Sequence, residues 1–293
     1  MNESHAGQLR KLLAGPAFIA PGVYDGLTAL QVQRAGFDCV YVSGASIAFT
    51  RLGRPDIGLT TMTEVADIVS NIRERIDIPV IVDGDTGFGN ALNVQRTVRL
   101  FERMGASAVQ LEDQTLPKRC GHLDGKTLVP VGEMVGKIRA ALDARADDDT
   151  AIIARTDAIA VSGLDEALER GAAYADAGAD VLFVESPLDD EQLRIVGDEL
   201  GATVPLLANM VEGGKTPLHT VDELAAFGYR VVIFPGAMLR MVSRAAAIYL
   251  DALKRDGTTA GIMDRMFDFR AVNAVIGTDE MLANGKRYEN KKG

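Results

Sequence analysis

The sequence alternates between short apolar runs and longer amphipathic stretches along most of its length. The apolar runs are rich in Val and Ile and bounded by Gly, Asp or Pro, which is typical of buried parallel strands. Eight strands are predicted in this way, at residues 18–21, 39–42, 79–82, 108–111, 151–154, 181–184, 205–208 and 230–234. Helical periodicity predicts the helices between them at residues 26–35, 62–75, 92–103, 132–143, 165–177, 190–200 and 221–227. This order predicts an α/β fold, a (β/α)8 barrel of the TIM type, and leaves a doubly wound open sheet as the alternative.

Two further helical segments follow the eighth strand, at residues 238–255 and 259–283. A barrel needs only one helix there, so we expect the terminal helix to pack on a neighbouring subunit. No linker interrupts the pattern, which predicts one domain over residues 1–293, with the barrel at about 16–255 and a C-terminal helical extension at about 256–285. The polar N-terminus, which contains His5, is expected to be mobile.

Composition and charge narrow the classes of function. No apolar run approaches membrane-spanning length and the N-terminus is too polar for a signal peptide, so we expect no membrane partner and a cytoplasmic location. The presence of only two cysteines, Cys39 and Cys120, suits a reducing compartment. Cys39 lies inside an apolar strand and is predicted to be a core residue. A net charge of −10 argues against nucleic acid. An anionic substrate would then require a metal or a local cluster of Lys and Arg.

Polar residues recur at the C-terminal ends of the predicted strands, where the active site of such a barrel lies. These candidates are Tyr41, Ser43, Gly44, Ala45, Asp83, Asp85, Glu112, Asp113, Arg155, Asp157, Glu185, Asn209 and Pro235. Arg155 would project into the barrel mouth and bind a substrate carboxylate through two hydrogen bonds. An ion pair with Glu185 or Asp157 is the alternative, and the two can coexist.

Asp83 and Asp85 are two positions apart, so their side chains should point the same way. Carboxylates gathered at one point without Cys or His favour a hard divalent cation, Mg²⁺ or Mn²⁺. We expect Glu112 and Asp56 in an outer shell around that cation. The alternative is that these aspartates only cap turns.

Residues 114–130 show no clear periodicity, and a loop of this length inside a compact domain tends to be a functional lid. Its centre reads KRCGH at residues 118–122, which places a thiol between two cations and a histidine. Such a thiol can hold or deliver a proton near neutral pH, unlike an ordinary buried cysteine. The alternative is an incidental loop cysteine. His219 is expected to cap a helix or to face solvent.

These motifs together resemble the isocitrate lyase and phosphoenolpyruvate mutase superfamily. The similar blocks are KRCGH, typical of the lyase branch, DGDTGFGN at the metal segment, and the later ARTDA and LLANMVEGGKTP. The resemblance implies an Mg²⁺-dependent barrel and a homotetramer of dimers that exchange their last helices. It implies that Asp83 and Asp85 bind the metal and that Cys120, Lys118, His122 and Glu185 form the catalytic set. The substrate-binding positions would be Tyr41, Ser43, Gly44, Ala45, Arg119, Gly121, Arg155, Asn209 and Pro235.

The chemistry that the resemblance implies is cleavage of a 2-hydroxy di- or tricarboxylate, of the 2-alkylmalate or methylisocitrate type, to pyruvate and a carboxylic acid. Cys120 would protonate the enolate-like fragment. Methylisocitrate lyases typically carry Gly where Ala45 stands and a hydroxyl-bearing block at Met210 and Val211, which favours a smaller dicarboxylate such as 2,3-dimethylmalate. Pro235 resembles the lyases, because oxaloacetate hydrolases tend to have serine there. The alternatives are oxaloacetate hydrolysis, a carboxyphosphonoenolpyruvate-type phosphonomutase activity, and a non-catalytic metal-binding barrel.

Overall fold

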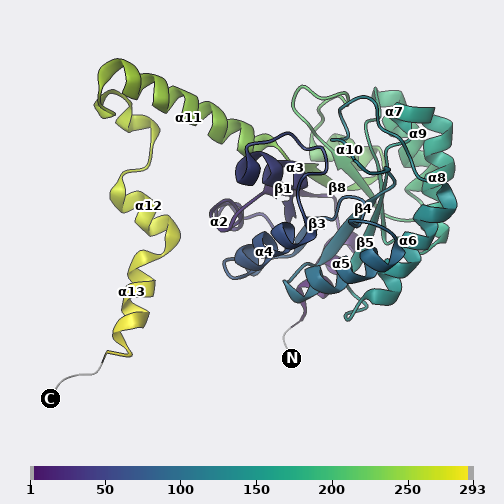
Figure 1. The fold of residues 1–293 in the computed structure, drawn as a ribbon, viewed down its shortest axis with the longest axis horizontal. Helices are drawn as coiled ribbons and strands as arrows, with labels where there is room; N and C mark the ends of the chain where they lie inside the picture. Colours follow the sequence, from purple (N-terminus) through teal and green to yellow (C-terminus); the bar gives the residue numbers. More distant parts are fainter. Residues whose placement is uncertain (1–2, 290–293) are drawn as a thin grey trace. The chain divides into compact units, whose positions relative to one another are not determined.

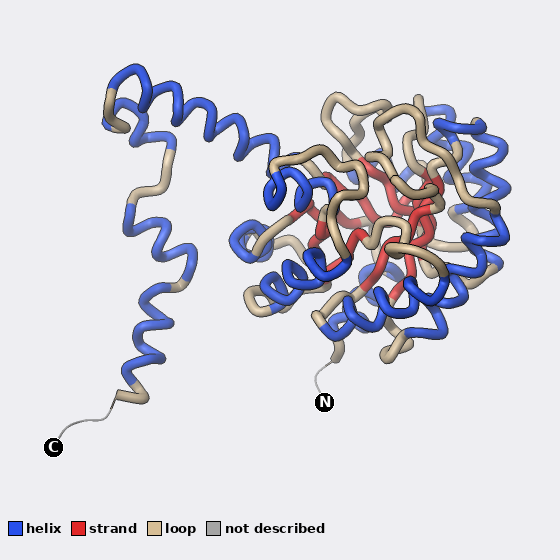
Figure 2. Tube along the Cα trace, viewed as in Figure 1, coloured by secondary structure: helices blue, strands red, loops and turns tan. Residues whose placement is uncertain are grey.

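The computed structural model describes residues 3–289, and its strands form a closed parallel barrel in chain order (Figures 1 and 2). The strands are β1 Phe18–Val23, β2 Val40–Val42, β3 Val80–Asp83, β4 Ala108–Glu112, β5 Ala151–Thr156, β6 Val181–Val184, β7 Leu206–Asn209 and β8 Tyr229–Phe234. The barrel closes where β8 pairs with β1, with Val231 opposite Phe18. The predicted (β/α)8 fold is therefore confirmed, and the open sheet is excluded.

Helices surround the barrel, as Figure 2 shows, and most of them match the predicted positions. They are α2 Gly26–Arg34, α4 Met62–Arg73, α5 Ala91–Arg103, α6 Val131–Ala144, α8 Leu164–Asp176, α9 Asp190–Leu200 and α10 Val221–Ala226. The helix that follows β8 is α11 Ala237–Asp256. Short helices, α3 Gly44–Ile47, η1 Ala48–Leu52 and α7 Ile159–Ser162, follow β2 and β5. Local side-chain hydrogen bonds fix where helices start. Thr61 caps the N-terminus of α4, and its side chain and backbone exchange hydrogen bonds with Glu64.

Alternate strand residues face the barrel interior, because side chains on a strand alternate with a period of two. Toward the N-terminal ends of the strands these interior positions are apolar and fully buried, and form one cluster. Its strand residues include Ala20, Tyr41, Ile81, Ala108, Ile153, Phe183, Leu207 and Ile233, and Cys39 directly precedes β2. Cys39 is 0% exposed, which confirms its prediction as core.

A further helix, α1 His5–Ala14, closes the N-terminal end of the barrel, which we call the floor. The Ser4 hydroxyl accepts a hydrogen bond from the Gly7 amide and so caps the helix. Leu9 and Leu13 are buried in the same apolar cluster as the strands. The expectation of a mobile N-terminal segment is therefore wrong. Its polar composition reflects the outer face of a helix that buries only a narrow apolar stripe.

The chain divides into two compact units between Met238 and Leu239. The second unit contains most of α11, then η2 Ala260–Arg265, α12 Phe269–Ile276 and α13 Thr278–Lys286. The single helix predicted over residues 259–283 is therefore wrong: Gly277, at φ 77°, ends α12 in the left-handed conformation that glycine favours. In this unit Phe269, Met281 and Leu282 are 86%, 64% and 60% exposed. Along residues 3–289, no helix combines the length and apolarity needed to span a membrane.

Candidate active site

Along each strand, the side chains that face the barrel interior form a column. Each column is apolar at the floor and becomes polar at the C-terminal end of the barrel, which we call the mouth. In β3, Asp83 follows Ile81 by two positions, and in β5 Arg155 follows Ile153 in the same way. Continuing each column by two residues places Glu112 above Gln110, Glu185 above Phe183 and Asn209 above Leu207. The same period of two that builds the core therefore directs these polar side chains into the mouth.

Three of these carboxylates form a compact group. One ligand oxygen from each of Asp83, Asp85 and Glu112 lies within 4.8 Å of the others, and all three residues are buried. Asp83 is fixed by the Gln110 side-chain amide at 3.1 Å and by the Gly44 backbone amide at 3.3 Å. Among residues 3–289, Glu112 Oε1 is a buried oxygen without a hydrogen-bond partner. Three convergent hard oxygens, one with a free lone pair, fit a divalent cation.

The pKa shifts of these carboxylates also favour a divalent cation at this site. Burial is the main cause that raises the pKa of Asp85 to about 6; Lys118 opposes the shift, whereas Asp83 and Asp56 add to it. Burial likewise raises the pKa of Glu112 well above its usual value, although Arg155 opposes it. A bound divalent cation would relieve the cost of holding these carboxylates ionised out of water.

Lys118 belongs to this carboxylate group in the structure. Its Nζ lies 2.7 Å from Asp56 Oδ1 and 2.6 Å from Asp85 Oδ1, and its side chain is 3% exposed. Burial opposes the ammonium form, but Asp85, Glu112 and Asp56 together raise the pKa of Lys118 well above its usual value. Lys118 therefore carries a positive charge that is directed at the metal-binding group.

The loop of residues 114–130 folds over the mouth. Its base is closed by a bridge between Gln114 and Leu128. At its centre Gly121 packs so closely that an added Cβ would lie 2.7 Å from Glu185 Cδ, so only glycine fits. His122 Nε2 lies 3.2 Å from Glu185 Oε1, while its Nδ1 accepts a hydrogen bond from the Lys215 amide at 3.0 Å. The loop is therefore closed in this structure.

The thiol of Cys120 differs from the sequence-based expectation of an activated group. Burial is the main cause that raises the pKa of Cys120, and a hydrogen bond from the His122 backbone opposes the shift. The two neighbouring cations do not activate it: Lys118 binds carboxylates, and the exposed Arg119 side chain donates to the Asp124 carbonyl at 2.7 Å. Cys120 is therefore a protonated thiol at neutral pH, which suits an acid better than a nucleophile.

Arg155 lies at the centre of the mouth among three carboxylates. Its Nε and Nη2 each donate to Asp157 at 3.0 Å, and its Nη atoms lie 3.5 Å from Glu112 and from Glu185. Burial opposes its charge, but Asp157, Glu185 and Glu112 raise the pKa of Arg155 well above its usual value. The ion pairs considered from the sequence are therefore present, and carboxylate binding by Arg155 stays a prediction.

Glu185 is held ionised by its neighbours. Burial alone would raise its pKa, but Arg155, His122 and Asn209 reverse that effect and hold the pKa of Glu185 well below its usual value. Asn209 Nδ2 donates to Glu185 Oε2 at 3.1 Å, and in the described part of the chain Asn209 Oδ1 is buried without a partner. This arrangement leaves an amide oxygen available at the mouth.

The remaining predicted residues lie on the β2 and β8 side of the barrel, and several of their polar groups form hydrogen bonds with other protein groups. The Tyr41 hydroxyl donates to Gln110 at 2.7 Å, and the Ser43 hydroxyl accepts the Ser46 amide at 3.2 Å. The Pro235 carbonyl accepts from the Ser46 hydroxyl at 3.0 Å. Ala45 is half-buried in α3.

Two residues used in the sequence argument do not reach the mouth. Met210 is 0% exposed and lies outside the barrel, where its Sδ accepts a hydrogen bond from the His219 amide at 3.4 Å. It cannot by itself set the size of the substrate. The His219 ring bonds Asp190 at 2.9 Å and has a structural role.

Sequence reasoning did not single out Gln110, and it named Asp113 only as a strand-end candidate; the structure buries both residues at or beneath the mouth. Asp113 accepts from the Thr156 and Tyr174 hydroxyls at 2.7 and 2.8 Å and so braces the end of β5. Gln110 had a signal, a lone amide inside an apolar strand. Such a group has to find partners when it is buried.

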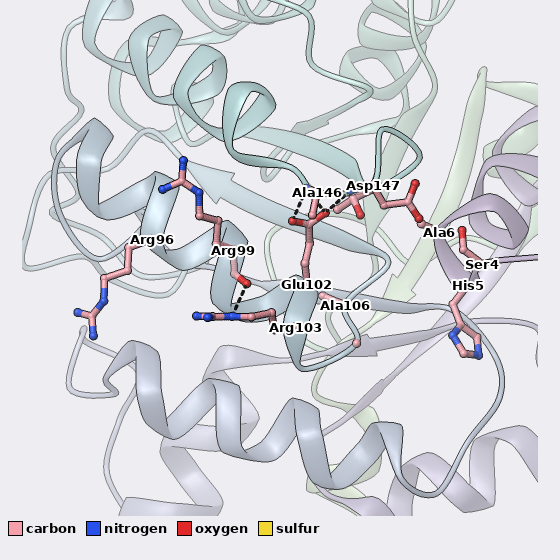
Figure 3. Close-up of a pocket in the computed structure, with 12 residues that line it drawn as sticks. Ser4, His5, Ala6, Arg96, Arg99, Glu102, Arg103, Ala106, Ala146 and Asp147 are labelled. Carbon is pink, nitrogen blue, oxygen red and sulfur yellow. Dashed lines mark hydrogen bonds between the residues drawn. The ribbon is translucent and has the colours of Figure 1, made fainter.

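A separate groove of about 830 Å³ lies at the floor, at the opposite end from the mouth (Figure 3). It is formed by the start of α1, the second half of α5 and the segment that follows α6. Its residues are Ser4, His5, Ala6, Arg96, Arg99, Glu102, Arg103, Gly105, Ala106, Ala146, Asp147 and Thr150. The predicted site residues do not line this groove, so it is not the candidate active site.

The chain is similar to known proteins over most of its length. The family model described as phosphoenolpyruvate phosphomutase matches residues 9–254, which is most of the chain. The chain belongs to the isocitrate lyase/phosphoenolpyruvate mutase superfamily. A 2,3-dimethylmalate lyase from Eubacterium barkeri is 47% identical over 94% of this chain and 95% of its own length. A 2-methylisocitrate lyase from Aeropyrum pernix is 47% identical over 85% of this chain and 79% of its own.

A solved structure from this superfamily has the same fold. A crystal structure of 2,3-dimethylmalate lyase, in its trigonal form, matches with a TM-score of 0.92 and 39% identity. The match covers 99% of this chain and 98% of that one. The family predicted from the sequence motifs is therefore confirmed.

Proposed function

We propose that this protein is an Mg²⁺-dependent carbon–carbon lyase that cleaves a small 2-hydroxy dicarboxylate to pyruvate and a carboxylic acid. The observation that carries the proposal is that one mouth combines a buried three-carboxylate group with a charged arginine and a protonated thiol. The carboxylates suit a cation, Arg155 suits a substrate carboxylate, and Cys120 suits proton delivery. The likeness to lyases over most of the chain supports the same reaction class.

Each group has a defined task in this proposal. Asp83, Asp85 and Glu112 would hold Mg²⁺, which supplies a Lewis acid that lowers the pKa of the substrate hydroxyl. Arg155 would orient a substrate carboxylate, and the closed loop would keep water from the enolate-like fragment. That fragment would form when a base takes the hydroxyl proton and the adjacent carbon–carbon bond breaks, with pyruvate as the other product. The Cys120 Sγ–H would then deliver its proton to the carbon of that fragment. His122 and Asn209 keep Glu185 ionised beside Arg155.

The substrate we propose is of the 2,3-dimethylmalate or 2-alkylmalate type. The lyase of that name covers nearly the whole chain at 47% identity. Ala45 adds a methyl group directly after Gly44, whose backbone amide donates to Asp83. We also propose a cytoplasmic homotetramer, in which the exposed apolar residues of α12 and α13 pack on another copy of this chain.

A substrate panel tests the reaction. Purified protein with Mg²⁺ is offered 2,3-dimethylmalate, 2-methylisocitrate, isocitrate, oxaloacetate and phosphonopyruvate. Release of 2-oxo acid is followed by reduction with lactate dehydrogenase, and oxalate is measured for oxaloacetate. We expect pyruvate from 2,3-dimethylmalate, loss of the activity in EDTA, and its return with excess Mg²⁺. Oxalate formation alone would replace the proposal with oxaloacetate hydrolysis, and cleavage of methylisocitrate alone would correct the substrate.

A further inference from the structure

We infer that Lys126 is a positioning residue that holds the catalytic loop, residues 114–130, closed. Its side chain joins the loop to the carboxylate of Asp157, which also binds Arg155, and we call this link the latch. This inference rests on the proposed function, because it concerns the delivery of Cys120 to the same mouth. The observation behind it is a buried ammonium group that bonds the loop backbone on one side and Asp157 on the other.

The latch consists of two bonds made by one side chain. Lys126 Nζ donates to the carbonyl of Gly121, at the centre of the loop, and lies 2.8 Å from Asp157 Oδ1. The side chains of Lys126 and Asp157 are 1% and 0% exposed, so this ion pair is fully shielded from water. The loop is therefore tied to the end of β5 through a charge that solvent cannot screen.

Asp157 is the fixed side of the latch. Its backbone amide donates to Asp113 at 3.0 Å, and its carboxylate accepts Arg155 through two bonds of 3.0 Å. Gln114 Nε2 also donates to Asp157, at 3.2 Å. One carboxylate thus sets the position of Arg155 and of the loop together.

The same loop offers a matched exposed ion pair. Lys215 Nζ lies 2.7 Å from Asp124 Oδ1, but these side chains are 31% and 92% exposed. Exposed pairs contribute little because water screens them, whereas an ammonium removed from a buried pair is not replaced by water. Variants of the two lysines therefore separate the effect of burial on loop closure from the effect of charge.

Loss of the Lys126 ammonium should free the loop and leave Arg155 in place, because Asp157 keeps two bonds to Arg155. Cys120 would then be less well positioned while the substrate carboxylate still binds. The expected kinetic result is a fall in kcat that exceeds any rise in KM.

Cys120 provides a readout of the latch that does not depend on catalysis. Cys39 is 0% exposed, so labelling of the folded protein by iodoacetamide reports on Cys120, and a Cys120→Ser variant checks that Cys39 stays silent. We expect Lys126→Met and Lys126→Gln to raise the labelling rate by about tenfold, because the loop opens more often. Lys215→Met should change it less than about twofold. Lys126→Arg, which keeps the charge, should recover part of the protection.

Circular dichroism and thermal melting of each variant accompany the labelling. Labelling of both Lys126 variants at the wild-type rate would overturn the inference. So would a loss of folded structure in both, because Lys126 would then serve the stability of the barrel. If the wild-type protein cleaves none of the panel substrates, the proposed function fails, yet the labelling comparison still decides the latch.

Discussion

The floor and the mouth of this barrel are built from the same interior columns of side chains, but they use opposite chemistry. At the floor, Leu9 and Leu13 of α1 pack on strand residues such as Ala20, in a fully apolar cluster. At the mouth, the next positions of the same columns are charged and buried, and the pKa of Asp85 rises to about 6 chiefly through that burial. Burial stabilises the first region and costs free energy in the second. The comparison suggests that the floor supports the fold and the mouth supports the reaction.

Changing the thiol at the mouth should produce the largest effect. Cys120→Ser replaces the protonated thiol by a far weaker acid of similar size, so we expect kcat to fall by about 10²–10⁴. The melting temperature should stay close to that of the wild type, because Cys120 is not part of the apolar cluster. Steady-state kinetics and thermal unfolding measure the two quantities, and a variant that cleaves as fast as the wild type would remove Cys120 from the mechanism.

A change at the floor should show the opposite pattern. Leu9 is 1% exposed, so Leu9→Ala should lower the free energy of unfolding by about 2–5 kcal/mol. The kcat per folded molecule should be retained, because Leu9 lies at the far end of the barrel. Denaturant unfolding measures the loss, and Lys11→Gln is the control. The Lys11–Glu3 pair is 73% and 39% exposed, so this control should cost less than about 1 kcal/mol. If the folded Leu9→Ala variant had a lower kcat than the wild type, the floor and the mouth would not be independent.

The smallest expected effect is a shift in the pH dependence of the reaction. Since burial raises the pKa of Cys120, the thiol stays protonated at pH values where an ordinary thiol, with a pKa near 8.5, is already half ionised. The group is an acid with a raised pKa, so activity that needs the protonated form is present below that pKa and is lost only as pH rises through it. We expect kcat to hold through the pH range in which an ordinary thiol ionises, and to decline only at higher pH. A decline centred near pH 8 would contradict the buried thiol.

The sequence predicted the barrel and the strand ends well, because both follow from local patterns. Period-two columns and turn residues are visible in the sequence, and they placed Asp83, Arg155 and Glu185 at one end of the barrel. The partners of each charge depend on packing between distant segments, so Lys118 was assigned to the thiol although it binds Asp85 and Asp56. The N-terminal helix was missed because its apolar stripe is narrow.

Met210 shows a different kind of failure. Its position in a family block suggested a role in choosing the substrate, but one residue beyond β7 the alternation turns its side chain outward. Position in a motif and direction of the side chain are separate facts, and only the second decides contact with a ligand.

The period-two columns also limit how this protein can change over evolutionary time. A deletion of one residue within β5 would turn Arg155 out of the barrel and bring an apolar neighbour into its place. Such a deletion would remove the arginine from the mouth without altering any residue of the site itself. Between floor and mouth, each strand can therefore gain or lose only an even number of residues if its side chains are to keep their directions. The loops that follow the strands carry no such restriction, because a change in their length does not turn a strand side chain out of the mouth.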